Sequence, residues 1–504
     1  MPSNTANSRK QRNPMTHSSS LRSFRLVCKP EQIPLVEHLL QAQGFAFEPE
    51  PFFPLARRLT YEPLPLGASL AAFFGYIYVQ DRSSMLPPLA LAPESGDAVL
   101  DMCASPGSKT GLLAQMVGDT GFVLANEPSH ARLNTLRRNL QSLNLFCCAT
   151  CSYPGESLPL PSAGESREES SESPSCGWDR IQLDPPCSGW GTVEKNPQVL
   201  RLWRGDKIRP LIALQRRLLT EAFRLLRPGG RLVYSTCTTN SGENEEQIRF
   251  AREELGFSLL PVSPISGFRF VDPTAPDCSG VLRVQTGADG QGFFVALLQK
   301  PGQEGRTSFS EQVLSAENQD NEPPPHKGEP AEEEKPDQGF FVRPWDKDSR
   351  HVGERYRHAR GKRNRPEKRE GQLLGPDAFA GTCLTPALLP PGETAVFNST
   401  VHFLPALSRT LPRQGFVWKG FPLGRFGPDV RLNLRLRALM PPAEELLQKG
   451  VPCLDMDDPA LILALLAGQS LPADPAGAEA GLYFRGLPLC GLTVKGKRAM
   501  LPPG

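Results

Sequence analysis

The sequence predicts an α/β fold built on a parallel sheet that is covered by helices on both faces. Between about residues 97 and 300, short apolar runs alternate with amphipathic helical stretches, which is typical of such a sheet. The 504 residues, 39% of them hydrophobic, suffice for roughly three domains. Lys and Arg (56) nearly balance Asp and Glu (54), which leaves a net charge of +2. The overall charge therefore indicates no class of binding partner, and any binding of a polyanion must depend on local basic patches.

Five strands and four helices are expected in this core. The strands are predicted at Ala98–Cys103, Phe122–Glu127, Phe146–Ser152, Arg180–Asp184 and Arg231–Cys237. The helices are predicted at Thr110–Val117, Ser129–Leu143, Ile208–Leu226 and Glu243–Leu255. Two later runs, Gly280–Gln285 and Gly292–Gln299, are separated by turn-forming residues and predict an antiparallel pair at one edge of the sheet.

Segments of different composition flank and interrupt the core. Residues 1–20 predict a disordered basic tail, and residues 301–372, rich first in Pro and Glu and then in Arg and Lys, predict a disordered linker. Ser162–Ser175, almost without apolar residues, predicts a solvated loop. Residues 373–504 regain apolar residues among many Pro and Gly, which predicts one or two small β-rich modules.

We expect a cytoplasmic protein without a membrane segment or a metal. No apolar run follows the basic N-terminal residues, and the longest apolar run, Ala460–Ala467, is short of the roughly 20 residues that span a bilayer. The 12 cysteines are scattered without the paired C-x-x-C framework of a zinc ribbon. Cys147, Cys148 and Cys151 lack a fourth ligand nearby, so we expect no zinc.

The turn after the first strand predicts a nucleotide-type pocket. It comprises Cys103, Ala104, Ser105, Pro106, Gly107, Ser108 and Lys109, and a helix follows it. Such a turn lets backbone N–H groups approach a ligand at the carboxyl edge of the sheet. Because the turn lacks both phosphate-binding glycine patterns, an adenosine ligand without phosphates is favoured.

Glu127, at the end of the second strand, can accept hydrogen bonds from both hydroxyls of a ribose. Together with the preceding turn, it points to S-adenosylmethionine. The alternative is that Glu127 simply caps the following helix, since acidic residues favour helix N-termini.

Two cysteines follow neighbouring strands and are expected to face one cavity. Cys187 lies in Asp184-Pro185-Pro186-Cys187 and Cys237 in Ser235-Thr236-Cys237. A thiolate that adds to carbon 6 of cytosine makes carbon 5 nucleophilic enough to take a methyl group, and Asp184 can share a proton with ring N3. The alternative is that both are buried structural thiols. The residues alone do not decide which thiol attacks.

These motifs resemble the Nop/Sun family of RNA (cytosine-5)-methyltransferases over about Leu21 to Lys300. Further matches are Tyr78-Val79-Gln80-Asp81, Ser84, Lys195-Asn196-Pro197, Arg227-Pro228-Gly229-Gly230, Glu243-Asn244-Glu245 and Gly292-Phe293-Phe294. The resemblance implies a Rossmann-like seven-stranded methyltransferase sheet within residues 91–300, after an RNA-binding subdomain at 21–90. It also implies that the chain works as a monomer on RNA, with rRNA favoured over tRNA.

The resemblance also implies roles for individual residues. Cys237 would be the nucleophile, and Cys187 would assist release of the methylated base. Residues Cys103 to Lys109, Glu127 and Asp184 would contact the methyl donor, and Lys195 would steady the substrate. Near the C-terminus, Gly481–Leu489 followed by Lys495-Gly496-Lys497-Arg498 is similar to a PUA-like RNA-binding module of the bacterial small-subunit rRNA methyltransferase F group, which would occupy residues 373–504.

One departure from the family keeps alternatives open. The family usually places an Asp just after the third strand to bind the adenine amino group, whereas this chain has Cys151-Ser152-Tyr153-Pro154-Gly155-Glu156 there. Ser152 or backbone groups would have to substitute. The alternatives are a tRNA cytosine-5 methyltransferase, an amino-group methyltransferase using Asp184-Pro185-Pro186, and a non-catalytic RNA-binding ribosome-assembly factor.

Overall fold

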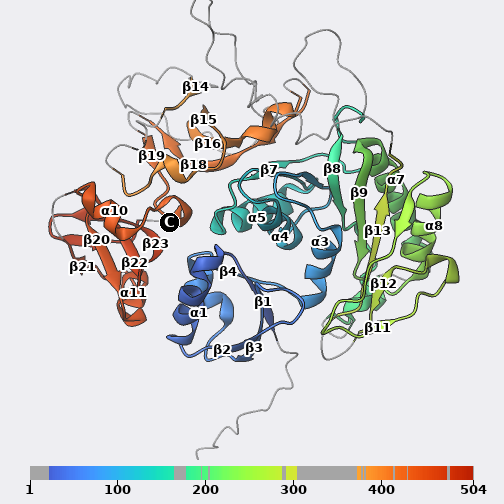
Figure 1. The fold of residues 1–504 in the computed structure, drawn as a ribbon, viewed down its shortest axis with the longest axis horizontal. Coiled ribbons are helices and arrows are strands. Elements are labelled where there is room, and N and C mark those ends of the chain that lie inside the picture. Colours follow the sequence, from blue (N-terminus) through green and yellow to red (C-terminus); the bar gives the residue numbers. More distant parts are fainter. Residues whose placement is uncertain are drawn as a thin grey trace, which may run out of the picture.

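The centre of the structure is a ten-stranded mixed sheet (Figure 1). Its strands are β5 (Ala98–Asp101), β6 (Phe122–Asn126), β7 (Cys148–Cys151), β8 (Trp178–Leu183), β9 (Leu226–Thr236), β10 (Ser258–Leu260), β11 (Phe270–Val271), β12 (Leu282–Val284), β13 (Phe293–Gln299) and β17 (Trp418–Lys419). The order is β11-β12-β13-β9-β8-β5-β6-β7-β17, and β10 pairs with β13. The run from β9 to β7 is parallel, as predicted.

This is a computed structural model of the chain. It describes residues 22–163, 177–193, 196–202, 205–286, 291–302, 372–375, 379, 382–412, 415–427, 430–473 and 477–502. The predicted basic tail, most of the Ser162–Ser175 insertion and nearly all of the predicted linker lie outside these residues.

Helices cover both faces of the sheet, because the strands bury side chains on both sides. The helices are α3 (Leu86–Leu91), α4 (Ser108–Val117), α5 (His130–Ser142), α6 (Val199–Leu202), α7 (Arg209–Leu225) and α8 (Glu245–Glu253). Val99 and Val123 pack with α3, α4 and α5, whereas the adjacent Leu100 and Leu124 pack with α7 and α8. This period of two places apolar residues in both layers, as expected for parallel strands.

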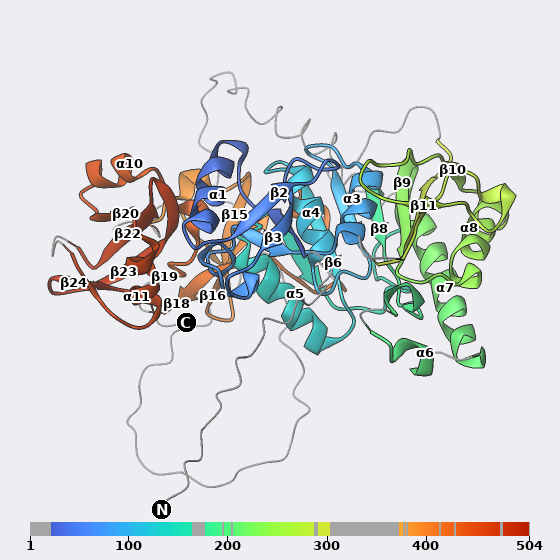
Figure 2. The same cartoon turned by 90° about the horizontal axis from the view of Figure 1, so that it is seen from below.

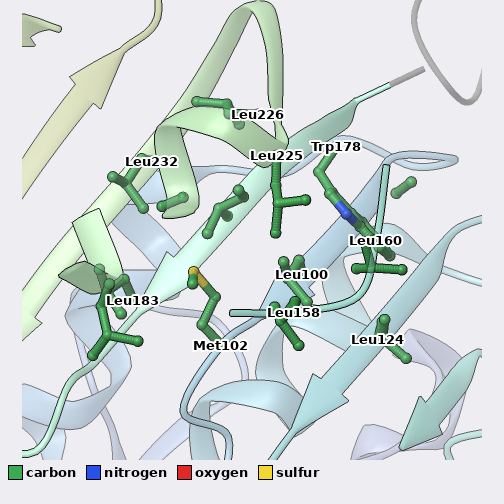
Figure 3. Packing of buried hydrophobic residues seen from close by; sticks show 14 of the residues in the cluster. Leu100, Met102, Leu124, Leu158, Leu160, Trp178, Leu183, Leu225, Leu226 and Leu232 are labelled. Atoms are coloured by element: carbon green, nitrogen blue, oxygen red, sulfur yellow. The ribbon is translucent and has the colours of Figure 1, made fainter. Parts of the chain in front are cut away.

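Figure 3 shows the layer under α7. Leu100 of β5, Leu183 of β8 and Leu232 of β9 lie close to Leu225 at the end of α7 and to Met102. All of these side chains are buried. The packing fixes the strand ends from which the turns Met102–Lys109 and Asp184–Gly189 leave the sheet.

The predicted number of seven strands is wrong, although the predicted strands and the antiparallel edge pair β12 and β13 are confirmed. β10 and β11 enlarge the antiparallel edge. At the other edge, β17 pairs antiparallel with β7, Trp418 opposite Cys151. No local pattern predicts this strand, because its partner lies far away in the chain.

A four-stranded antiparallel sheet precedes the central one. Its strands are β1 (Ser23–Leu26), β2 (Ala46–Pro49), β3 (Ala56–Tyr61) and β4 (Ile77–Val79), in the order β2-β3-β1-β4, and its helices are α1 (Ile33–Gln41) and α2 (Leu70–Phe73). Val36, Leu39 and Leu40 form the buried face of α1.

Two five-stranded sheets follow, which confirms the predicted β-rich modules. The first has the order β14 (Gln372–Leu373), β15 (Gly392–Phe397), β16 (Thr400–Pro405), β18 (Phe421–Phe426), β19 (Val430–Leu432). The second has the order β20 (Cys453–Met456), β22 (Glu479–Phe484), β23 (Leu487–Lys495), β24 (Arg498–Met500), β21 (Leu471–Pro472), with α10 (Ala443–Gln448) and α11 (Pro459–Leu466). Within the described ranges, every helix falls short of the length and apolarity needed for a membrane span.

The second C-terminal sheet packs against the N-terminal sheet (Figures 1 and 2). One apolar cluster joins Phe24, Leu39 and Leu40 to Leu482 and Leu492. The buried Arg437 guanidinium spans this junction. It donates hydrogen bonds to the backbone oxygens of Phe74 (2.7 Å), Gly75 (2.6 Å) and Val27 (3.0 Å) and stacks 3.9 Å from the Tyr76 ring centroid. We call this junction the seam.

Candidate active site

The turns that follow the parallel strands meet at the carboxyl edge of the sheet, and the predicted site residues lie in them. Ala104, Ser105 and Gly107 are buried, Cys103, Ser108 and Lys109 are half-buried, and Pro106 is exposed. Burial raises the pKa of Cys103 well above that of an ordinary thiol. The carboxyl edge is where ligands bind in open α/β sheets.

Asp101, the last residue of β5, stabilises the turn that leads into α4. Its Oδ2 accepts a hydrogen bond from Thr110 Oγ1 at 2.7 Å, which ties the end of β5 to the first turn of α4. The carboxyl is 1% exposed, and burial raises its pKa to about 7.

Gly107 lets the turn enter α4 directly. Its φ is +104°, a conformation that residues with a Cβ rarely adopt, and an added Cβ would lie 2.9 Å from Leu136 Cδ1. Asn139 Nδ2 donates to the Pro106 carbonyl at 2.7 Å, and Arg132 donates to the Ser105 carbonyl at 2.9 Å. The turn is therefore fixed from α5 as well as from β5.

Glu127 takes the helix-capping role that was posed as the alternative, and its carboxylate keeps further acceptor capacity. Its Oε1 accepts from the Ser129 backbone N–H at 2.9 Å, and its Oε2 lies 3.4 Å from Arg132 Nη1. The residue is 1% exposed. Because a carboxylate offers about four lone-pair positions, these contacts leave room for ribose hydroxyls.

Asn126 is a structural residue of the site that the sequence reasoning missed. Its Nδ2 donates to the backbone oxygens of Met102 (3.1 Å) and Tyr153 (3.0 Å), and its Oδ1 accepts from the Tyr153 N–H (3.0 Å). It thus joins the turns after β5 and β7. The available signal was a polar residue ending the apolar run Phe122–Ala125.

The corner where the family usually has an Asp is built from Ser152 and Tyr153. The Ser152 hydroxyl donates to the Pro128 carbonyl at 3.4 Å. The Tyr153 ring stacks on Phe416, with centroids 5.3 Å apart, and its hydroxyl accepts from the Val417 N–H at 2.6 Å. A C-terminal segment therefore braces this corner of the edge.

Cys187 and Cys237 lie together, as the sequence predicted for thiols at neighbouring strand ends. Their sulfur atoms are 3.3 Å apart, and both residues are half-buried. The hydrogen bond between them, with burial, raises the pKa of Cys187 well above its usual value. The same hydrogen bond, aided by the Lys109 ammonium, lowers the pKa of Cys237 against the effect of burial. The two thiols can therefore share one proton, and either sulfur can be its donor.

Asp184 and Lys109 form an ion pair beside the thiols. Lys109 Nζ lies 2.7 Å from Asp184 Oδ2, and Asp184 Oδ1 accepts from Ser235 Oγ at 2.9 Å. Although burial opposes its charge, the ion pair with Asp184 raises the pKa of Lys109. The pair links the turn after β5 to both cysteine-bearing strand ends.

Glu243 and Asn244 form hydrogen bonds with the two loops that carry Cys187 and Cys237. Glu243, fully buried, accepts from the Ser188 N–H at 2.9 Å, from Ser188 Oγ at 2.5 Å and from Gln215 Nε2 at 3.1 Å. Ser188 and Thr238 hydroxyls lie 2.7 Å apart. Asn244 accepts from Thr236 Oγ1 at 2.6 Å and donates to the Thr238 carbonyl at 3.0 Å, so it brackets Cys237. The sequence marked both residues as motif matches without a role.

Lys195, predicted to steady the substrate, lies outside the described residues. No group of three or more His, Cys, Asp or Glu side chains is arranged to hold a metal ion in the part of the chain that the structure describes. The edge therefore brings together two adjacent thiols, an ion pair and a nucleotide-type turn.

The chain is similar in sequence to several known proteins. Residues 88–299 match the family model described as 16S rRNA methyltransferase RsmB/F. A protein named ribosomal RNA small subunit methyltransferase F from Shewanella amazonensis is 35% identical over 281 residues, which cover 55% of this chain and 57% of that protein. The protein of the same name from Salmonella heidelberg is 37% identical over 255 residues, covering 47% and 48%.

Among solved structures, a methyltransferase homolog protein from Pyrococcus horikoshii is 31% identical. The match has a TM-score of 0.46 and covers 56% of this chain and 86% of that one. The chain spans about half the length of the curated relatives it matches.

Proposed function

We propose that this chain, which is similar to the RsmB/F 16S rRNA methyltransferases over residues 88–299, transfers a methyl group from S-adenosylmethionine to carbon 5 of a cytosine in RNA, with rRNA favoured. One observation carries the proposal. The sulfur atoms of Cys187 and Cys237 lie 3.3 Å apart at the carboxyl edge, and their pKa values are shifted in opposite directions.

The residues at the first turn fit the methyl donor. Gly107 brings backbone N–H groups to the N-terminus of α4, and the buried Glu127 carboxylate has acceptor positions for a ribose. The corner at Ser152 and Tyr153 would receive the adenine without the usual Asp. Bound there, S-adenosylmethionine would supply an electrophilic methyl group.

Cys237 acts as the nucleophile in this proposal. Its thiolate lone pair forms a bond to carbon 6 of cytosine, and the electrons of the C5–C6 double bond make carbon 5 nucleophilic. The lowered pKa of Cys237 increases the thiolate fraction near neutral pH. Asp184, held by Lys109 and Ser235, can share a proton with ring N3 as charge develops.

Cys187 assists release of the methylated base. Its pKa is raised chiefly by the hydrogen bond to Cys237, and this cause disappears once Cys237 sulfur is bonded to the base. Cys187 can then lose its own proton to solvent, and the resulting thiolate can accept the proton that must leave carbon 5. Loss of that proton re-forms the C5–C6 double bond, and the sulfur–carbon bond to Cys237 breaks.

The flanking parts of the chain would bind RNA. Residues 91–300 would form the methyltransferase domain, 21–90 an RNA-binding subdomain and 373–504 a PUA-like RNA-binding region. The turn Lys495-Gly496-Lys497-Arg498 between β23 and β24 is exposed and basic, which supports a phosphate contact there. Lys195 would steady the substrate.

Trapping with RNA that contains 5-azacytidine tests the nucleophile. The wild-type protein should form a denaturation-resistant RNA adduct, and Cys237→Ala should form none. Cys187→Ala should accumulate an adduct even with ordinary RNA, because addition proceeds while release slows. Cys453→Ala, a half-buried thiol far from the edge, is the matched control. An adduct at the wild-type level in Cys237→Ala would exclude this nucleophile.

Three further measurements separate the alternatives. Mass spectrometry of digested RNA distinguishes methylation of carbon 5 from methylation of the exocyclic amine. Calorimetric titration with S-adenosylmethionine distinguishes an enzyme, which should bind the methyl donor, from a ribosome-assembly factor, which should not. The missing Asp would favour the assembly factor. Bisulfite sequencing of total RNA with and without the protein identifies rRNA or tRNA as substrate.

A further inference from the structure

A cavity of about 200 Å³ lies between α5 and β7 on one side and the C-terminal strands β16, β17 and β18 on the other. Its polar lining comprises Arg137, Gln141, Thr150, Thr400, His402 and Lys419. We call it the α5–β17 cavity. It is separate from the cysteine pair, and the proposed methylation uses none of its side chains.

The sheet register brings two cations into this cavity. Lys419 of β17 is the direct partner of Thr150 of β7, and opposite residues of paired strands project to the same face. On that face, Arg137 of α5 donates its Nε hydrogen to Thr150 Oγ1 at 2.9 Å. Arg137 and Lys419 therefore approach each other from different parts of the chain.

The two cations share the cavity without a carboxylate. No Asp or Glu lines it among the residues that the structure describes. Burial, and then the charge of Arg137, lowers the pKa of Lys419, and burial lowers the pKa of Arg137. Burial also lowers the pKa of His402 to about 4, so this ring adds no charge near neutral pH.

Several other arginines near the interior are paired with carboxylates, although Arg437, within the described part of the chain, is not. Examples are Arg57 with Glu37, Arg82 with Glu50, Arg227 with Asp179 and Arg283 with Glu245. Two partly desolvated like charges without a counter-ion destabilise the fold unless an anion joins them. Among the described contacts, the terminal nitrogens of Arg137 and the Lys419 ammonium make no hydrogen bond, so both are available as donors.

We propose that the α5–β17 cavity is an anion site that binds a phosphate group. A guanidinium, an ammonium and the hydroxyls of Thr150 and Thr400 match the acceptors of a phosphate. The source that fits best is the RNA backbone, which rests on the proposed function. Thr150 directly precedes Cys151 at the carboxyl end of β7, so a phosphate held there would align RNA entering the active edge from the C-terminal modules.

The first arm of the test uses inorganic phosphate and the full chain. Phosphate should raise the thermal midpoint of the wild-type protein more than chloride does at equal ionic strength, because a ligand stabilises the state that binds it. Lys419→Gln should lose this difference, and Lys419→Glu, which pairs with Arg137, should lose it as well. Without phosphate both variants should be at least as stable as the wild type. Lys449→Gln, an exposed lysine of the same region, is the control.

The second arm measures RNA affinity against salt concentration without methyl donor. Lys419→Gln should weaken binding about fivefold to tenfold and reduce the slope of log affinity against log salt by about 0.7, the value for one single-stranded phosphate contact. Lys449→Gln should change neither. Both effects together support RNA as the source of the phosphate.

The remaining outcomes are distinct. A Lys419-dependent phosphate effect with an unchanged RNA slope supports the site with a free phosphate compound as its ligand. No phosphate effect and an unchanged slope would overturn the proposal. The phosphate arm requires neither RNA nor a methyl donor, so its result stands even if the Cys237 adduct does not form.

Discussion

The carboxyl edge and the seam both bury polar groups, but they use them differently. At the edge, Glu243 and Asn244 receive and donate hydrogen bonds around the loops of Cys187 and Cys237 while the two thiols themselves stay half-buried. At the seam, the Arg437 guanidinium donates only to backbone oxygens and lies against the Tyr76 ring.

This difference indicates what each region is for. The polar groups around the two thiols hold reactive atoms in position and leave them accessible, so changes at Glu243 or Asn244 should alter rates more than folding. At the seam, Nε and Nη2 of Arg437 donate to backbone carbonyls that take no part in the proposed chemistry. Changes there should alter the free energy of unfolding and leave the chemistry of the thiols intact.

The seam gives the largest expected effect. Arg437→Met should lower the free energy of unfolding by about 4 to 5 kcal/mol, because several buried carbonyls lose their donor and the stacked cation is removed. Urea denaturation measures the change. Arg435→Met, an exposed neighbour, should cost less than about 1 kcal/mol. Equal effects of the two substitutions would contradict the seam's structural role.

Asp101 should make the edge sensitive to pH. Its folded pKa of about 7 lies above the ordinary 3.8, so its stabilising contribution is complete below pH 3.8 and is lost as the pH rises through 7. The rise in the pKa from 3.8 to about 7 corresponds to roughly 4 kcal/mol. Unfolding of the wild type and of Asp101→Asn should be compared from pH 4 to 8. Between pH 4 and pH 8, the free energy of unfolding of the wild type should fall by about this amount relative to that of Asp101→Asn. A difference between the two proteins that stays constant over this range would contradict the prediction.

Glu243 should act as a positioning residue. Glu243→Gln exchanges an acceptor oxygen for a donor facing Ser188 and Gln215, and should reduce turnover about 100-fold, equivalent to about 2.7 kcal/mol. The KM for the methyl donor should change little. The pH profile of Cys237 alkylation should shift, since the Cys187 contact loosens, and a purely structural effect would leave this profile unchanged. Glu246→Gln, an exposed residue three positions further along the chain in α8, is the control.

The edge is largely predictable from the sequence. Asp184, Cys187 and Cys237 each follow an apolar strand, and parallel strands bring their ends to one side of a sheet. Glu127 shows the limit of this reasoning, because the sequence posed helix capping and ribose binding as alternatives, whereas the carboxylate that caps α5 retains acceptor positions.

The seam and the α5–β17 cavity are not predictable in this way. The acceptors of Arg437 are backbone oxygens, which carry no signal in residue type. β17 is two residues long and pairs with β7 across a large separation in sequence, so the meeting of Lys419 and Arg137 depends on tertiary packing alone. Asn126 is an intermediate case. Its place at the end of an apolar run is visible in the sequence, but its hydrogen bonds to Met102 and Tyr153 depend on the fold.

The smallest effect expected is at Gly107, where conformation and contact can be separated. Gly107→Ala should cost about 2 kcal/mol of stability, from the left-handed backbone and from a Cβ placed 2.9 Å from Leu136 Cδ1. Gly256 also has a positive φ, +82°, but a Cβ added there would meet no atom within 4 Å, so Gly256→Ala should cost about 1 kcal/mol through the backbone alone. The difference between the two measures the contact with α5. If Gly107→Ala also weakens binding of S-adenosylmethionine while Gly256→Ala does not, the turn is shaped for the ligand as well as for the fold. If both substitutions lower the stability equally and leave binding unchanged, Gly107 is not part of the proposed site.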